Sequence, residues 1–205
     1  MISLRHKFLY VHIPKTAGNA VQNVLRNYSE DRVVCLTPYQ DGLERFEVRN
    51  DQFDIQKHST LSDYQRELGD ATLGSLFKFS CVRNPWERAI SYYFSPHRSV
   101  SHWDRTAFLK LLEEMLPVAA YLKMEGPPAR LCPFDNMDHI MRFERLEEDF
   151  GATCQRLGLP IQNLAVRNKS ARQHFSTYYD PELVEIVRQR FADEIEHFGY
   201  EFGKL

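Results

Sequence analysis

The chain reads Phe8-Leu9-Tyr10-Val11-His12-Ile13-Pro14-Lys15-Thr16-Ala17-Gly18-Asn19-Ala20 near its start. The apolar run at residues 8–11 predicts a short buried strand, which leads into a tight loop. A helix is predicted after the loop, because apolar side chains recur there at helical spacing, namely Ala20, Val21, Val24, Leu25 and Tyr28. The stretch therefore predicts a strand that runs through a loop into a helix.

The loop has the features of an anion site. Backbone N–H groups at a helix N-terminus lack partners within the helix, and the helix dipole adds positive charge there. Lys15 brings a mobile point charge to the same loop. We expect the loop to bind a phosphate, or a phosphate that bears a second anionic group. It is not a Walker A loop, in which glycine precedes the lysine, and an ordinary turn with a solvated lysine is the alternative.

A second unit of the same kind begins at residues 76–82, which predict another buried strand. Arg83 follows directly, and Asn84-Pro85 suits the N-cap and first position of a helix. Ser91 then lies about two turns into that helix. The planar guanidinium groups of Arg83 and Arg88 are suited to an anion, although a solvated or salt-bridged position is the alternative for Arg88.

Together the two units resemble the sulfotransferases that use 3′-phosphoadenosine 5′-phosphosulfate (PAPS). The first resembles the family's 5′-phosphosulfate loop. The second resembles its 3′-phosphate motif, an arginine at a strand end with a serine on the next helix. The second unit is most similar to the carbohydrate sulfotransferase branch, of Golgi and bacterial type. Later segments resemble that branch in the same order: residues 138–150 with Arg142-Phe143-Glu144, Asn168-Lys169-Ser170, Tyr178-Tyr179 and His197-Phe198-Gly199-Tyr200.

The resemblance implies which residues hold PAPS. The phosphosulfate end falls to Pro14, Lys15, Thr16, Ala17, Gly18, Asn19 and Ala20, and the 3′-phosphate falls to Arg83 and Ser91. The chain departs from the family pattern at Asn19 and Ala20, where hydroxyl residues are usual. Asn19 can still donate from its amide, whereas Ala20 can donate only from its backbone. Lys15 is suited to neutralise charge on the sulfuryl oxygens or the leaving phosphate, and no metal is required.

The reaction also needs a base, and histidine is the usual one near neutral pH. Among the 8 histidines, His58 lies before the second strand, where the carbohydrate branch carries its catalytic histidine. We expect His58 to be the base, with a surface histidine at a helix start as the alternative. His12 could instead line the loop that is expected to hold the phosphosulfate end of PAPS. His97 and His102 could border the acceptor site, where aromatic neighbours could stack a sugar or an aryl group.

Composition and charge are those of a compact enzyme. The 205 residues, 43% of them hydrophobic, suffice for one sulfotransferase domain over residues 1–205. The net charge of −2 gives no general field for nucleic acid or a membrane surface. The scattered cysteines predict no zinc site or disulfide framework; they are Cys35, Cys81, Cys132 and Cys154. No apolar run suits a signal peptide or a membrane span, so we expect a cytoplasmic enzyme.

The order of elements predicts an α/β fold. A short strand is expected at residues 33–36, a polar loop-rich segment at 37–56, and helices within 103–123 and over 142–157. Gly126-Pro127-Pro128 predicts a loop, and the last helix is capped by Asp180 with Pro181 at its first position. Strands that alternate with helices favour a central parallel sheet flanked by helices, with ligands at the strand carboxyl ends. The resemblance implies a fold like that of P-loop nucleotide hydrolases.

We therefore expect transfer of a sulfuryl group from PAPS to a hydroxyl of a carbohydrate or small metabolite, in line and with a histidine base. Two other functions stay open. A P-loop-like phosphotransferase would normally carry a true Walker A order and an acidic magnesium ligand, and the sequence shows neither clearly. A non-catalytic nucleotide-binding module would keep the sites at Lys15 and Arg83 and need no base.

Overall fold

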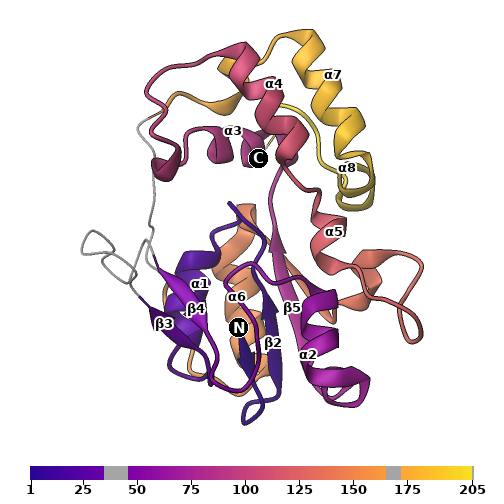
Figure 1. Ribbon diagram of the computed structural model, residues 1–205. Coiled ribbons are helices and arrows are strands. Elements are labelled where there is room, and N and C mark those ends of the chain that lie inside the picture. The colour runs from indigo at the N-terminus through magenta and orange to yellow at the C-terminus, as the bar shows by residue number, and fades with distance from the viewer. Residues whose placement is uncertain (35–45, 165–171, 205) are drawn as a thin grey trace.

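The computed structural model describes residues 1–34, 46–164 and 172–204. Within these ranges the largest sheet has four strands in the order β1, β2, β5, β6 (Figure 1). The strands are β1 (Ile2–Ser3), β2 (Phe8–Val11), β5 (Phe77–Val82) and β6 (His139–Arg142). β1 is antiparallel to β2, whereas β2, β5 and β6 run parallel. The predicted α/β fold with a mainly parallel sheet is confirmed.

The pairing of β2 with β5 positions both predicted anion sites. Val11, the last residue of β2, pairs with Ser80 of β5, and the Ser80 hydroxyl donates to the Val11 carbonyl at 2.7 Å. Since parallel strands end at the same edge of a sheet, the loop after β2 and the turn after β5 leave this edge side by side. Segments about 70 residues apart in sequence thus meet, as the two pairs Phe8–Phe77 and Val11–Ser80 require.

Both faces of β2 are buried, and alternate side chains enter different apolar clusters. Phe8 and Tyr10 pack with α1 (Gly18–Leu25) and α6 (Leu146–Arg156). Leu9 and Val11 pack with α2 (Leu61–Gly74) and α5 (Val118–Leu122). The sheet is therefore the middle layer of three, and the predicted strand over residues 8–11 has the predicted bounds.

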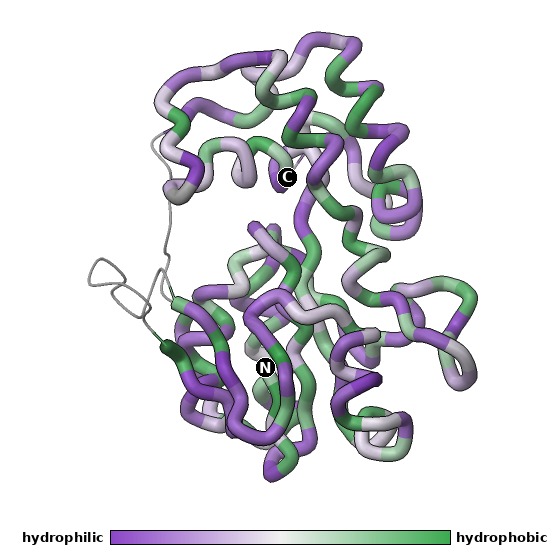
Figure 2. Tube along the Cα trace, viewed as in Figure 1, coloured by the Kyte–Doolittle hydropathy of each residue, from purple (hydrophilic) through white to green (hydrophobic). Residues whose placement is uncertain are grey.

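A third apolar cluster joins the helices that lie beyond the carboxyl ends of β2 and β5 (Figure 1). These are α3 (Pro85–Tyr93), α4 (Arg105–Glu114), α7 (Pro181–Arg190) and α8 (Ala192–Phe198). Hydrophobic residues recur along these helices and along the strands in Figure 2, where polar residues occupy much of the connecting chain. The loop after β2 thus lies between the sheet and this helical layer, where Pro14 accepts a hydrogen bond from Arg88 of α3.

Cap residues explain where several helices begin. The Asn84 side chain accepts from the N–H groups of Trp86 and Glu87, and Pro85 is the first residue of α3. The Asp180 side chain accepts from the Leu183 N–H at the start of α7. Both predicted caps are confirmed.

Three expected elements need correction. The helix expected over 142–157 begins only at Leu146, because Arg142 pairs with Val82 in the sheet and residues 143–145 form a 3₁₀ turn. The last helix is divided at Phe191 into α7 and α8. The segment expected to be loop-rich contains β4 (Glu47–Arg49), which pairs with β3 (Arg32–Val34).

Some expectations concern residues that the structure does not describe. The strand expected at 33–36 is observed as β3 up to Val34, and the remaining residues fall outside the described ranges. Asn168-Lys169-Ser170 and Cys35 also fall outside them. In the part of the chain that is described, no helix combines the length and the apolar character needed to cross a membrane.

Candidate functional site

The loop after β2 has an uncommon backbone. Lys15 and Ala17 adopt φ angles of 70° and 66°, in the left-handed region that residues with a side chain seldom enter. Inside the loop, the Thr16 hydroxyl donates to the Ile13 carbonyl at 2.8 Å, and the Ala20 N–H donates to the Ala17 carbonyl at 3.0 Å. The Thr16 hydroxyl and the Ala20 amide therefore shape the loop. Strained backbone of this kind persists where surrounding contacts fix it, often at functional sites.

Gly18 lets the end of β2 pack against the start of α1. A Cβ atom placed on Gly18 would lie 1.9 Å from the imidazole of His12. The His12 ring thus occupies the space that any other residue at position 18 would fill. This contact fixes where α1 starts, and with it the direction of the N–H groups in its first turn.

Lys15 points across the loop toward the end of α3. Its ammonium donates to the Ser95 hydroxyl at 3.1 Å. Burial, and then the nearby charges of Arg83, Arg172 and Lys57, lower the pKa of Lys15 to about 8 from its ordinary 10.5. Burial is the largest cause, and three cationic side chains near Lys15 add to it because like charges raise the cost of keeping the ammonium protonated.

Arg83 brings the second unit into contact with the first. Its guanidinium donates to the Lys15 carbonyl at 3.1 Å and to the Ser91 hydroxyl at 3.4 Å, and also bonds to Glu87. The guanidinium lies over the Phe143 ring, 3.7 Å from its centroid. The structure therefore brings Lys15, Arg83 and Ser91 together.

Two further residues of this network were not predicted. Glu87 is shared between Arg83 and Arg172, and the Arg172 guanidinium donates to its two oxygens at 2.6 and 3.3 Å. Arg83 lies in the turn before α3 and Glu87 in the first turn of that helix, so their nearness in sequence is a signal that could have revealed their pairing. The spacing to Arg172 carries no such signal, because the contact depends on the tertiary fold.

Arg88 is buried beside Glu194, so it occupies the salt-bridged position that was the alternative to anion binding. It is 1% exposed, donates to the carbonyls of Pro14 and Leu116 at 3.2 and 2.9 Å, and lies 3.5 Å from Glu194. Burial raises the pKa of Glu194 to about 6, against the opposing effect of the Arg88 charge. Arg88 thus ties α3 to the loop after β2 and to α8.

His58 lies beside His12, at the start of the loop after β2. Its Nδ1 contacts the His12 carbonyl at 3.1 Å, and the two imidazole rings are 4.5 Å apart. A carbonyl only accepts, so Nδ1 of His58 must carry the proton, and Nε2 is the basic nitrogen in the neutral ring. Burial, followed by the nearby charges of His58 and Lys57, holds the pKa of His12 well below its ordinary value. His12 is therefore neutral at pH 7 and buried, which suits a packing role.

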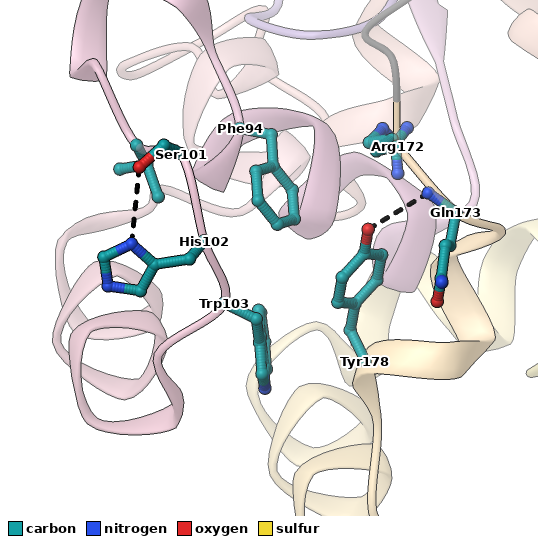
Figure 3. Close-up of a pocket in the computed structure, with 8 residues that line it drawn as sticks. Phe94, Ser101, His102, Trp103, Arg172, Gln173 and Tyr178 are labelled. Atoms are coloured by element: carbon teal, nitrogen blue, oxygen red, sulfur yellow. Dashed lines mark hydrogen bonds between the residues drawn. The ribbon is translucent and has the colours of Figure 1, made fainter.

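A pocket of about 740 Å³ opens beside the end of α3 (Figure 3). Its lining includes Phe94, His102, Trp103 and Arg172. Of the two histidines expected near an acceptor site, His102 lines this pocket. The side chain of His97 lies outside what the structure describes.

The arrangement can bind a multiply charged anion and present a base to it. Cationic side chains from the loop after β2, from the turn between β5 and α3, and from the segment before 3₁₀ helix η4 (Phe175–Tyr178) gather at one sheet edge. The imidazole of His58 lies beside the start of the same loop. Among the residues described, His, Cys, Asp and Glu side chains form no group of three that could hold a metal ion.

Comparison with known proteins agrees with the geometry. The model of the sulfotransferase family matches residues 1–110, just over half of the 205 residues. Comparisons with curated proteins and with solved structures gave no significant match. The matched part contains the loop with Lys15, His58, and the turn and helix that carry Arg83 and Ser91. The chain belongs to the sulfotransferase family.

Proposed function

We propose that the protein transfers a sulfuryl group from PAPS to an acceptor hydroxyl. Family membership supports sulfuryl transfer, and the anion-binding geometry supports PAPS as the donor. The residues proposed to hold PAPS are Pro14, Lys15, Thr16, Ala17, Gly18, Asn19, Ala20, Arg83 and Ser91. In this proposal the loop holds the phosphosulfate end, and Arg83 with Ser91 holds the 3′-phosphate.

The charge around Lys15 is the main support for an anionic donor. The pKa of Lys15 is lowered to about 8 by burial and by three neighbouring cations. The Nε of Arg83 is also buried without a hydrogen-bond partner. An anion bound here would relieve the repulsion and complete the hydrogen bonding of Arg83, since charge-assisted hydrogen bonds are the strong ones.

The chain's own residues can perform what sulfuryl transfer requires. PAPS, when bound, supplies the activated sulfuryl group and a phosphate leaving group. His58 Nε2 takes the proton of the acceptor hydroxyl as the new O–S bond forms. Lys15 neutralises the negative charge that grows on the leaving phosphate oxygen as the old S–O bond breaks. The His12 carbonyl holds the His58 ring in the required tautomer.

The acceptor, the domain extent and the cellular location are also part of the proposal, and they are based mainly on the sequence. The acceptor is the hydroxyl of a carbohydrate or small metabolite, and residues 1–205 form one sulfotransferase domain. The succession of strand, anion loop and helix supports the P-loop-like arrangement. The scattered cysteines are the support for a cytoplasmic location.

Calorimetry with adenosine 3′,5′-bisphosphate (PAP) and with ATP tests the donor. We expect PAP to bind more tightly, because ATP lacks the 3′-phosphate that Arg83 and Ser91 are proposed to bind. Arg83→Ala should weaken PAP binding at least several-fold, whereas Arg188→Ala, an exposed arginine of α7, should leave it unchanged. Equal affinity for ATP and PAP would favour a phosphotransferase, and tight PAP binding without turnover would favour a non-catalytic module.

A further inference from the structure

We propose that Glu87 is a positioning residue: its carboxylate holds Arg83 and Arg172 together, and this makes the site selective for nucleotides that carry a 3′-phosphate. The inference rests on the proposed function, because it concerns how that donor is recognised. Glu87 lies in the first turn of α3 and is 8% exposed. A buried carboxylate repels a phosphate nearby, so this repulsion must be offset by what Glu87 does for the two arginines.

The carboxylate of Glu87 bonds to both guanidinium groups. Arg83 donates to Oε1 from Nη2, and Arg172 donates to Oε1 from Nη2 at 2.6 Å and to Oε2 from Nη1 at 3.3 Å. Charge-assisted bonds fix geometry as well as adding energy, above all where one arginine makes two of them to one carboxylate. Glu87 therefore joins an arginine four positions before it to one that lies 85 positions after it.

Glu87 also helps to fix the plane of the Arg83 guanidinium. Nη1 of Arg83 donates to the Lys15 carbonyl at 3.1 Å and to the Ser91 hydroxyl at 3.4 Å, while Glu87 accepts from Nη2. Because the guanidinium is planar, bonds at both terminal nitrogens determine where the Nε–H points. This Nε is buried and has no hydrogen-bond partner among the described residues. Glu87 thus sets the direction of a donor group that is available to an anion.

The charge of Glu87 allows the two arginines to lie side by side. Burial lowers the pKa of Arg83, the charge of Glu87 acts in the opposite direction, and the charge of Arg172 lowers this pKa further. Without the carboxylate, two like charges would face each other in a poorly solvated place. With it, two arginines and one glutamate still leave one positive charge to attract an anion.

Two simpler roles for Glu87 predict different results. As a bare charge it would repel a 3′-phosphate, and its removal would strengthen PAP binding. As an acidic residue in the first turn of α3 it would stabilise the helix through the dipole, and its removal would affect every nucleotide alike. A positioning role predicts that recognition of the 3′-phosphate becomes weaker although a negative charge has been removed.

Calorimetric titration with PAP and with adenosine 5′-monophosphate (AMP), which lacks the 3′-phosphate, separates these roles. Glu87→Gln should weaken PAP binding about three- to tenfold, the range for one lost hydrogen bond, because an amide offers one oxygen to two arginines. AMP affinity should hardly change. Glu182→Gln should leave both affinities unchanged. It is the matched control, because Glu182 is the first-turn glutamate of α7 and pairs with Arg105.

Two further variants complete the test. Glu87→Asp keeps the negative charge on a side chain that is one carbon shorter, so it should also lower the ratio of PAP affinity to AMP affinity. If Glu87→Gln does not fold, this ratio in Glu87→Asp decides. In an Arg83→Ala background, Glu87→Gln should reduce PAP affinity less than it does alone, because effects of residues in one network are not additive.

Several results would overturn the inference. Tighter PAP binding in Glu87→Gln would make Glu87 a repelling charge, and equal weakening of PAP and AMP would make it a structural residue. A ratio of affinities that neither Glu87 variant alters, or full additivity with Arg83→Ala, would overturn the inference too. Equal affinity of the unaltered protein for PAP and AMP would instead reject the proposed donor.

Discussion

PAP binding should draw a proton onto Lys15, and the amount follows from its pKa. With a pKa of about 8, Lys15 of the free protein is about 90% protonated at pH 7, about 50% at pH 8 and about 10% at pH 9. A bound phosphate would return the pKa toward its ordinary value of 10.5. Binding should therefore take up about 0.1 proton at pH 7, about 0.5 at pH 8 and about 0.9 at pH 9.

Calorimetry in buffers of different ionisation enthalpy measures this uptake directly. Lys57 is the matched control, because burial also lowers its pKa to about 8 while its ammonium bonds to the Phe46 carbonyl. Lys15→Gln should lose most of the uptake at pH 9, and Lys57→Gln should keep most of it. Phosphate groups are fully ionised at pH 8 and above, so they contribute little there. Proton uptake that stays constant from pH 7 to pH 9, or that persists in Lys15→Gln, would refute the conclusion that the pKa of Lys15 is lowered in the free protein and rises on binding.

Other predictions concern the base, the loop and the buried ion pair. His58→Ala should lower turnover by roughly 100-fold, the usual scale for base removal, and leave PAP affinity unchanged; turnover near normal would reject the role. Gly18→Ala should lower the melting temperature and cost about 1–3 kcal/mol, because its Cβ would overlap the His12 ring; an unchanged melting curve would contradict the packing. Arg88→Ala should cost about 3–5 kcal/mol at pH 7 by leaving the buried Glu194 without its cationic partner. It should cost less at pH 5, where a group whose pKa burial raises to about 6 is protonated; equal loss at both pH values would exclude that mechanism.

The local parts of the fold could be predicted because short-range chemistry sets them. The apolar run of β2 and the proline after Asn84 each act within a few residues, and the structure has β2 and the start of α3 where they indicate. The meeting of Lys15 with Arg83 was also predictable, since both follow strands of one parallel sheet. The same reasoning failed for Arg142, whose partner in β5 lies 60 residues away in the chain, at Val82.

The parts of the candidate site that sequence could not provide are tertiary contacts. Ser95 meets Lys15 across 80 positions, and Arg172 meets Glu87 across 85. No periodicity or cap signal encodes such pairs, because they depend on how the helical layer sits above the sheet edge. Arg88 shows the converse, since its residue type suited an anion while the fold buries it at 1% exposure.

Transfer of labelled sulfate from PAPS to a glycan, measured together with the release of PAP, tests the central claim most directly. We predict one PAP released for each sulfated product formed by the unaltered protein. Lys15→Ala should lower turnover more than it weakens PAP binding, because its contact with the growing charge belongs mainly to the transition state. Turnover in Lys15→Ala within about twofold of normal would contradict the catalytic role of this lysine, since loss of such a contact usually costs far more. Transfer of a phosphoryl group from ATP in place of sulfate from PAPS would contradict the proposed reaction itself.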